Sequence, residues 1–85
     1  MAAIPMSKAG AIMNEIADSV KNELNITNKR IMCVSVFGFV INGRNKESDL
    51  IADKIKSILF DRKIGFTEVS DSAGIDINVE LEMNS

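Results

Sequence analysis

A chain of 85 residues with a formal net charge of −2 and 46% hydrophobic residues has the size of one small globular domain. Such a domain buries only about 60% of the surface of its unfolded chain, so its stability margin is small. With one cysteine and no histidine, the composition excludes an internal disulfide and histidine-based catalytic triads, and it argues against a zinc site. We therefore expect a protein without metal, cofactor or enzymatic activity.

The N-terminal residues lack the basic segment and the continuous apolar segment of a secretory signal. No apolar stretch approaches the roughly 18 residues that span a bilayer. We expect a cytoplasmic protein that does not enter a membrane.

Residues 1–6 are expected to form a flexible N-terminal lead, followed by a single small α+β domain over residues 7–85. Apolar residues at three- and four-residue spacings predict an amphipathic helix from about residue 8 to residue 24, with Ser7 as its N-cap. The apolar stripe of this helix is Ala9, Ile12, Met13, Ile16, Ala17, Val20 and Leu24.

The next element is an apolar segment from Ile31 to Ile41, in which β-branched and aromatic residues predict one continuous strand. Both faces of this strand are apolar, which indicates burial on both sides. Gly38 within it marks a bulge or a close approach of another backbone segment. Cys33 lies in the middle of the strand, where a thiol behaves as a small hydrophobic side chain.

A turn at Asn42-Gly43 leads to a second helix, expected over about residues 47–61 with Asn45 or Ser48 as its N-cap. No second strand directly follows this turn, so a tight hairpin is disfavoured here. The expected inner stripe of the helix is Leu50, Ile51, Ile55, Ile58 and Leu59.

Residues 64–83 are expected to form a β-hairpin with a four-residue turn from Asp71 to Gly74. Apolar and polar residues alternate along its second strand, which predicts one face in the core and one in water. The inward set is Ile75, Ile77, Val79, Leu81 and Met83, and the outward set is Asp76, Asn78, Glu80 and Glu82.

These elements give the order α-β-α-β-β and predict an α+β fold. The expected architecture is a two-layer α/β sandwich, with two helices on one face of a three-stranded mixed or antiparallel sheet. Two strand orders stay open, with the first strand beside the third or beside the second. The first of these orders is favoured, and it places the apolar strand 31–41 at an edge of the sheet.

An apolar edge strand invites pairing with another chain unless something covers it. The simplest resolution is a homodimer joined through the first strands across a two-fold axis. Cover by a helix or by the N-terminal lead is the alternative. The candidate self-association residues are Val34, Val36, Phe37 and Phe39.

Charge is unevenly distributed along the chain. Residues 29–63 hold eight bases and four acids, whereas residues 64–85 hold five acids and no base. Bases can contact the phosphates of a nucleic acid, and on one extended strand those before residue 31 and after residue 41 would lie roughly 35–40 Å apart, in two patches. The candidate partner or nucleic-acid contacts are Lys29, Arg30, Arg44, Lys46, Lys54, Lys56, Arg62 and Lys63.

Residues two apart on a strand stand about 7 Å apart, so the carboxylates of Asp76, Glu80 and Glu82 are too spread to converge on one point and indicate a solvated face, not a catalytic or metal site. We therefore expect a small non-catalytic protein that binds a protein partner and modulates it, most simply by inhibition, as a homodimer. Antagonists that phages and other mobile elements make against host enzymes are proteins of this kind. The alternative is an accessory protein that binds RNA or DNA through the basic band 29–63.

Overall fold

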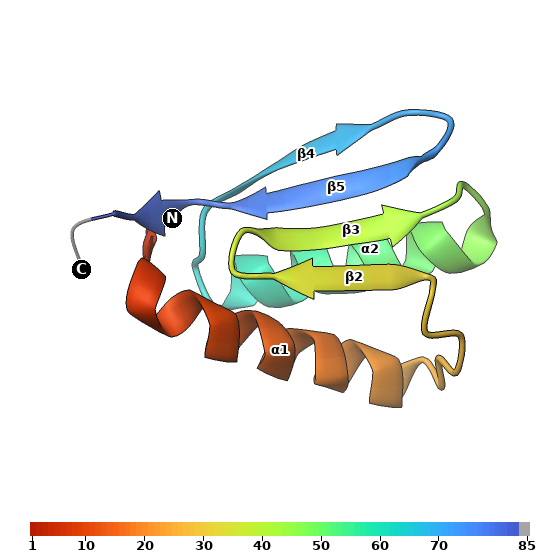
Figure 1. Cartoon of the computed structure of the whole chain (residues 1–85), viewed down its shortest axis with the longest axis horizontal. Helices are drawn as coiled ribbons and strands as arrows, with labels where there is room; N and C mark the ends of the chain where they lie inside the picture. The colour runs from red at the N-terminus through yellow and green to blue at the C-terminus, as the bar shows by residue number, and fades with distance from the viewer. Residues whose placement is uncertain (84–85) are drawn as a thin grey trace.

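The computed structural model describes residues 1–83, and the last two residues of the expected domain, 84 and 85, lie outside it. Within the described residues, helices and strands follow in the order β1-α1-β2-β3-α2-β4-β5-β6. Four strands form an antiparallel sheet in the order β2-β3-β5-β4, and β1 pairs with β6 in parallel (Figure 1). The α+β class is as predicted, whereas the prediction of a single three-stranded sheet is wrong.

The first residues of the chain belong to the fold. β1 (Ile4–Pro5) pairs with β6 (Leu81–Glu82), and Ile4 is buried. Ala2 adds two backbone hydrogen bonds, from its N–H to the carbonyl of Lys63 and from the N–H of Gly65 to its own carbonyl. The structure therefore places residues 2–5 beside the chain that follows the second helix, and not in a free lead.

The first helix, α1 (Met6–Glu23), begins directly after β1. Pro5, and not the predicted Ser7, is its N-cap residue. Its apolar stripe packs into the core as the three- and four-residue spacing predicts. The buried residues of α1 are Ala9, Met13, Ile16, Ala17 and Val20.

The apolar segment 31–41 folds as two strands, so the prediction of one continuous strand is wrong. β2 (Met32–Ser35) and β3 (Gly38–Asn42) form an antiparallel hairpin with a two-residue turn between them. The Ser35 hydroxyl closes this turn by accepting a hydrogen bond from the Phe37 N–H at 3.1 Å. A single strand of eleven residues would span about 36 Å. The longest dimension of the whole domain is also 36 Å, so one continuous strand would run the full length of the molecule.

Gly38 is required where β3 begins. Its φ of 138° lies in the region that favours glycine. A side chain at this position would collide with the backbone carbonyl of Ile77 on the neighbouring strand β5 (Gly74–Val79). The predicted close approach of another backbone segment at Gly38 is confirmed.

The second helix, α2 (Lys46–Asp61), begins with the predicted cap at Asn45. The Asn45 carboxamide oxygen accepts from the Ser48 N–H at 2.9 Å, and the Asn45 N–H donates to the Ser48 hydroxyl at 2.8 Å, which is a capping box. Ile51, Ile55 and Leu59 are buried as predicted. Leu50 is 59% exposed, so its assignment to the inner stripe was wrong.

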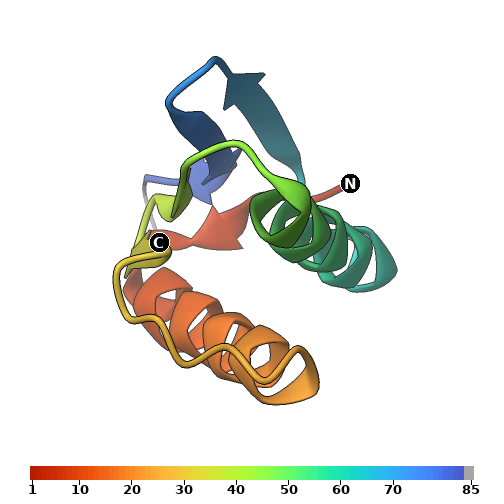
Figure 2. The same ribbon diagram turned by 90° about the vertical axis from the view of Figure 1, so that its right-hand side faces the viewer.

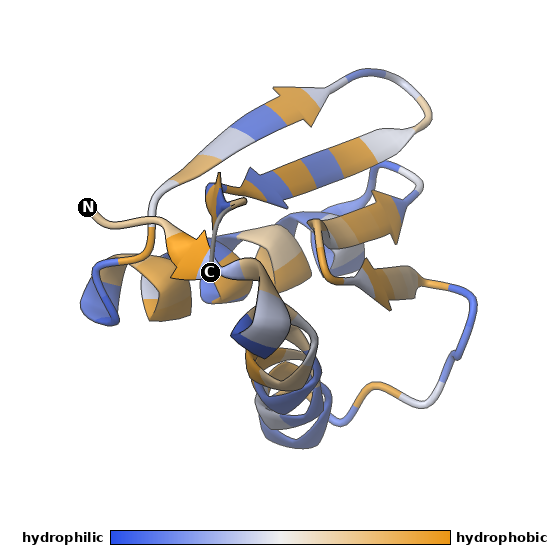
Figure 3. Cartoon of the chain, turned by 60° about the vertical axis from the view of Figure 1, so that its left-hand side comes forward, coloured by the Kyte–Doolittle hydropathy of each residue, from blue (hydrophilic) through white to orange (hydrophobic). Residues whose placement is uncertain are grey.

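The C-terminal hairpin forms as predicted, but its second strand is shorter: β5 ends at Val79, and Leu81 and Glu82 belong to β6. Met83, predicted to face the core, is 69% exposed, so that assignment was wrong. β4 (Phe66–Ser70) and β5 pair in antiparallel fashion, and the Asp71 N–H bonds to the Gly74 carbonyl in the turn at 3.0 Å. Buried and exposed residues alternate along β5, and Figure 3 shows the corresponding alternation of hydropathy.

The helices pack against one face of the four-stranded sheet. α2 packs against β3 and β5, α1 packs alongside β2, and the two helices contact each other (Figures 1 and 2). The opposite face of the sheet points away from both helices. Among residues 1–83, no helix is long and apolar enough to cross a membrane.

Candidate functional site

The sheet face opposite the helices has no covering element within residues 1–83. We call the outward side chains of β2, β3, β4 and β5 the open face, and all of them are exposed. Its one charged residue is Asp76, although 26% of the whole chain is charged. The centres of protein–protein interfaces show the same depletion of charge. The open face consists of Cys33, Ser35, Val40, Asn42, Thr67, Val69, Asp76 and Asn78.

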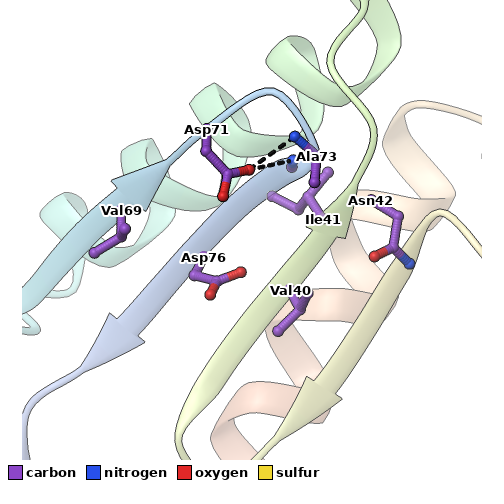
Figure 4. A pocket seen from close by; sticks show the side chains of 8 residues that line it. Val40, Ile41, Asn42, Val69, Asp71, Ala73 and Asp76 are labelled. Atoms are coloured by element: carbon purple, nitrogen blue, oxygen red, sulfur yellow. Dashed lines mark hydrogen bonds between the residues drawn. The ribbon is translucent and has the colours of Figure 1, made fainter.

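One cross-strand row forms the middle of the open face. Val40 on β3 and Val69 on β4 each pair with Asp76 on β5, so the carboxylate lies between two valines on neighbouring strands (Figure 4). Val40 is 43% exposed and Val69 is 61% exposed. Within residues 1–83, Asp76 forms no ion pair. The row therefore fits a lysine or arginine, whose methylene stem packs on the valines while its charge pairs with the carboxylate.

A depression of about 260 Å³ lies between this row and the β4–β5 turn (Figure 4). The turn is fixed by Asp71, whose carboxylate accepts from the N–H groups of Ala73 and Gly74 at 2.8 and 3.2 Å. Small-molecule sites usually measure about 300–1,000 Å³ and enclose their ligand. This depression is of the size to receive a side chain from a partner.

Cys33 lies on the open face, at the edge strand β2, and it is exposed. The expectation that it behaves as a core hydrophobic residue was wrong. The cause is the hairpin, which gives β2 one face toward α1 and the other toward water.

The four residues expected to mediate self-association lie in different environments. Phe39 is 1% exposed and belongs to the core. Val34 and Val36 are half-buried and pack against that core. Phe37, at the hairpin turn, is 57% exposed, so it presents the largest apolar surface of the four.

The hairpin also brings together basic residues that the sequence placed apart. Asn42 donates from its backbone N–H to the Ile31 carbonyl at 2.8 Å and from its side chain to the Arg30 carbonyl at 2.6 Å. The chain thus returns to the end of the sheet where β2 began. The expectation of two patches at opposite ends of one strand was wrong, since the bases before β2 and after β3 lie at the same end.

Half of the eight predicted basic contacts form ion pairs with acids of the same chain. The pairs are Arg44–Asp49 at 3.5 Å, Lys54–Glu23 at 2.6 Å, Lys56–Glu68 at 3.1 Å and Arg62–Glu15 at 2.8 Å. The other four, which form no ion pair within residues 1–83, are Lys29, Arg30, Lys46 and Lys63. Acids therefore interrupt the basic band.

A second depression, of about 240 Å³, separates α2 from the edge strand β4. Lys56 lies within it, 3.6 Å from Asp53 and 3.1 Å from Glu68, so two carboxylates share one ammonium group. This groove could not be predicted from the sequence, because it depends on the position of β4 at the sheet edge. The one sequence feature that relates to its acidic lining is the excess of acids after residue 63, to which Glu68 belongs.

In the described part of the chain, no group of three or more Cys, Asp or Glu side chains is placed to hold a metal ion. No protein-family model, curated protein or solved structure matches the chain.

Proposed function

We propose that this protein is a small non-catalytic binding protein of the cytoplasm. It docks its open face on a protein partner and modulates that partner, most simply by covering a functional surface. The row of Val40, Asp76 and Val69 is the observation that supports this proposal.

Two features of the row are unfavourable for a protein that acts alone. Full burial of a valine side chain provides roughly 1.5 kcal/mol or more, and Val40 and Val69, at 43% and 61% exposure, each forfeit part of it. Aspartate is disfavoured in strands, and Asp76 occupies an inner strand of the sheet. A partner that covers the valines and supplies a cation to Asp76 removes both disadvantages at once.

The same carboxylate argues against a second copy as the occupant. If two open faces packed across a two-fold axis through the centre of the row, Asp76 would face Asp76 with no base on either surface to separate them. Burial of unpaired carboxylates costs several kcal/mol. A different protein that presents lysine or arginine is therefore the better-supported partner, and homodimerisation through Val34, Val36, Phe37 and Phe39 is less well supported because Phe39 is in the core.

The proposal is tested by affinity capture from the cells in which the protein occurs, followed by binding assays with the purified partner. The wild type should retain a partner that the double variant Val40→Lys/Val69→Lys loses. Leu50→Lys is the matched control, because Leu50 is similarly exposed but lies on α2, away from the open face. If the double variant retained the same partner as the wild type, with the same affinity, docking through the open face would be wrong.

Binding of nucleic acid is a second candidate, because the hairpin places Lys29, Arg30, Arg44 and Lys46 at one end of the sheet. Phosphate contacts make binding depend strongly on salt. Filter binding of single-stranded RNA at 50 and 200 mM salt tests this, with Lys29→Glu/Arg30→Glu as the variant. Equal retention of RNA by variant and wild type would exclude this end of the sheet as the site.

A further inference from the structure

Two hydrogen bonds at the ends of β4 fix which of its backbone groups face β5. At one end the Asp71 N–H bonds to the Gly74 carbonyl at 3.0 Å, and at the other the Glu80 N–H bonds to the Gly65 carbonyl at 2.8 Å. In an antiparallel pair, hydrogen-bonded residues alternate with residues whose backbone groups point the other way. The pattern of the whole strand follows from these two ends.

By this alternation, Thr67 and Val69 direct their N–H and C=O groups toward β5. Phe66, Glu68 and Ser70 direct theirs toward the free edge of the sheet, because β4 is the last strand in the order. The edge thus offers three N–H donors and three C=O acceptors at a regular spacing. Such a row is a template for an added strand.

Apart from the charge of Glu68 on its helix side, the edge of β4 lacks the usual protection. In the described part of the chain, the helices pack against β2, β3 and β5, and α1 runs alongside the opposite edge at β2. β4 contains no proline and no lysine, the residues that commonly block edge pairing. Its one charge is on Glu68, which also forms the ion pair with Lys56 of α2.

Glu68 decides which strand the edge can accept. Antiparallel pairing of two copies uses all three outward residues in one register, which is centred on Glu68 and places Phe66 opposite Ser70. That register puts Glu68 directly opposite Glu68 of the other copy, and like charges in this position are destabilising. Asp53 and Glu68 share the single ammonium group of Lys56. A lysine or arginine opposite Glu68 would instead add a second cation beside these two carboxylates.

We propose that β4 accepts an extended segment of a protein partner as an added antiparallel strand, with lysine or arginine opposite Glu68. This rests on the proposed function only in that the partner is a protein. Phe60 lies one turn beyond Lys56 on α2 and is 68% exposed, so side chains of the added strand on the helix side would cover it. The absence of any base from residue 64 to residue 85 favours a basic segment over an acidic one.

The chain itself supplies a strand of the required chemistry. Glu68→Lys converts β4 into a basic strand of the same length, so a mixture of this variant with the wild type should form a heterodimer with Lys opposite Glu68. We expect a heterodimer in native mass spectrometry and sedimentation at micromolar concentration, at least ten-fold more abundant than either homodimer. The proposal would be overturned if the wild type alone formed as much homodimer as the mixture forms heterodimer. It would also be overturned if the mixture formed no heterodimer.

Ser70→Pro in the wild-type partner provides the edge control. The Ser70 N–H points to the free edge, so proline removes one donor for the added strand while the hydrogen bonds to β5 stay intact. The heterodimer should fall at least ten-fold with Ser70→Pro and be unchanged with Ser70→Ala. An unchanged heterodimer with Ser70→Pro would mean that association does not use this edge.

A peptide titration keeps the test decisive if Glu68→Lys does not fold. The probes are two synthetic peptides that copy residues 64–71, one with the native glutamate and one with lysine in its place. Wild-type protein should bind the lysine peptide at least ten-fold more tightly, with the largest NMR shifts at the amides of Phe66, Glu68 and Ser70. Equal affinities, or shifts confined to β2, would contradict the proposal.

The two proposals fail separately. Glu68 and Ser70 lie on the helix side of β4 and are not part of the open face. Absence of the heterodimer would leave docking through Val40 and Val69 unaffected. Failure of docking through the open face would likewise leave strand addition at β4 unaffected.

Discussion

The side chain of Asn42 donates a 2.6 Å hydrogen bond to the backbone carbonyl of Arg30, which ties the end of β3 to the start of β2. This contact closes the open end of a hairpin whose other end is the turn between Ser35 and Gly38. The hairpin gives the sheet its fourth strand, exposes Cys33 and Val40 on the open face, and gathers basic residues at one end.

Gly38→Ala should destabilise the protein by about 2–4 kcal/mol, because the added methyl group collides with the Ile77 carbonyl at a positive φ. Urea unfolding followed by circular dichroism measures this change. Gly43→Ala is the control, since Gly43 also has a positive φ, 83°, but a side chain there would meet only the Asn45 carboxamide nitrogen, at an ordinary contact distance of 3.8 Å. It should lose only about 1 kcal/mol, and equal losses at the two positions would contradict the close approach at Gly38.

Asn45→Ala should lower the free energy of unfolding by about 1 kcal/mol, because it removes the acceptor for the Ser48 N–H at the start of α2. Asn14→Ala is the control, since Asn14 is exposed in the interior of α1. That change should be neutral or slightly stabilising, because alanine has the higher helix propensity. Thermal unfolding of both variants distinguishes a cap from an ordinary surface asparagine.

Ile51→Ala and Leu50→Ala should differ sharply although the residues are adjacent. Ile51 is fully buried, so truncation leaves a cavity and costs about 2–5 kcal/mol. Leu50 is 59% exposed, and its truncation should cost less than about 0.5 kcal/mol. Chemical denaturation gives both values, and a large loss at Leu50 would place that side chain in the core after all.

Asp76→Val should raise stability by roughly 0.5–1 kcal/mol while weakening the captured interaction. Valine is favoured in a strand and joins Val40 and Val69 in one apolar row, but the cation of the partner loses its carboxylate. Asn78→Val, two residues along the same strand, should stabilise to a similar extent without that electrostatic loss. Undiminished partner binding by Asp76→Val would show that the carboxylate does not contribute to recognition.

Local patterns in the sequence were sufficient for the elements whose structure is set by neighbours in the chain. The stripe of α1, the cap of α2 at Asn45 and the alternation along β5 all follow from periods of 3.6 or two residues and from short-range hydrogen bonds. Leu50 shows the limit of this reasoning, because the width of a buried stripe depends on what packs against it.

The sequence by itself determined the α+β class, both helices and the C-terminal hairpin. The tertiary structure alone decided the break at Val36–Phe37, the strand order and the identity of the exposed edge. Ser35 and Gly38 interrupt the apolar run on either side of the turn, but they do not show that the backbone of Ile77, almost forty residues later in the chain, lies against Gly38. The open face and the β4 edge exist because β3 and β5 pair across that distance, and such pairing is specified by packing and not by local propensity.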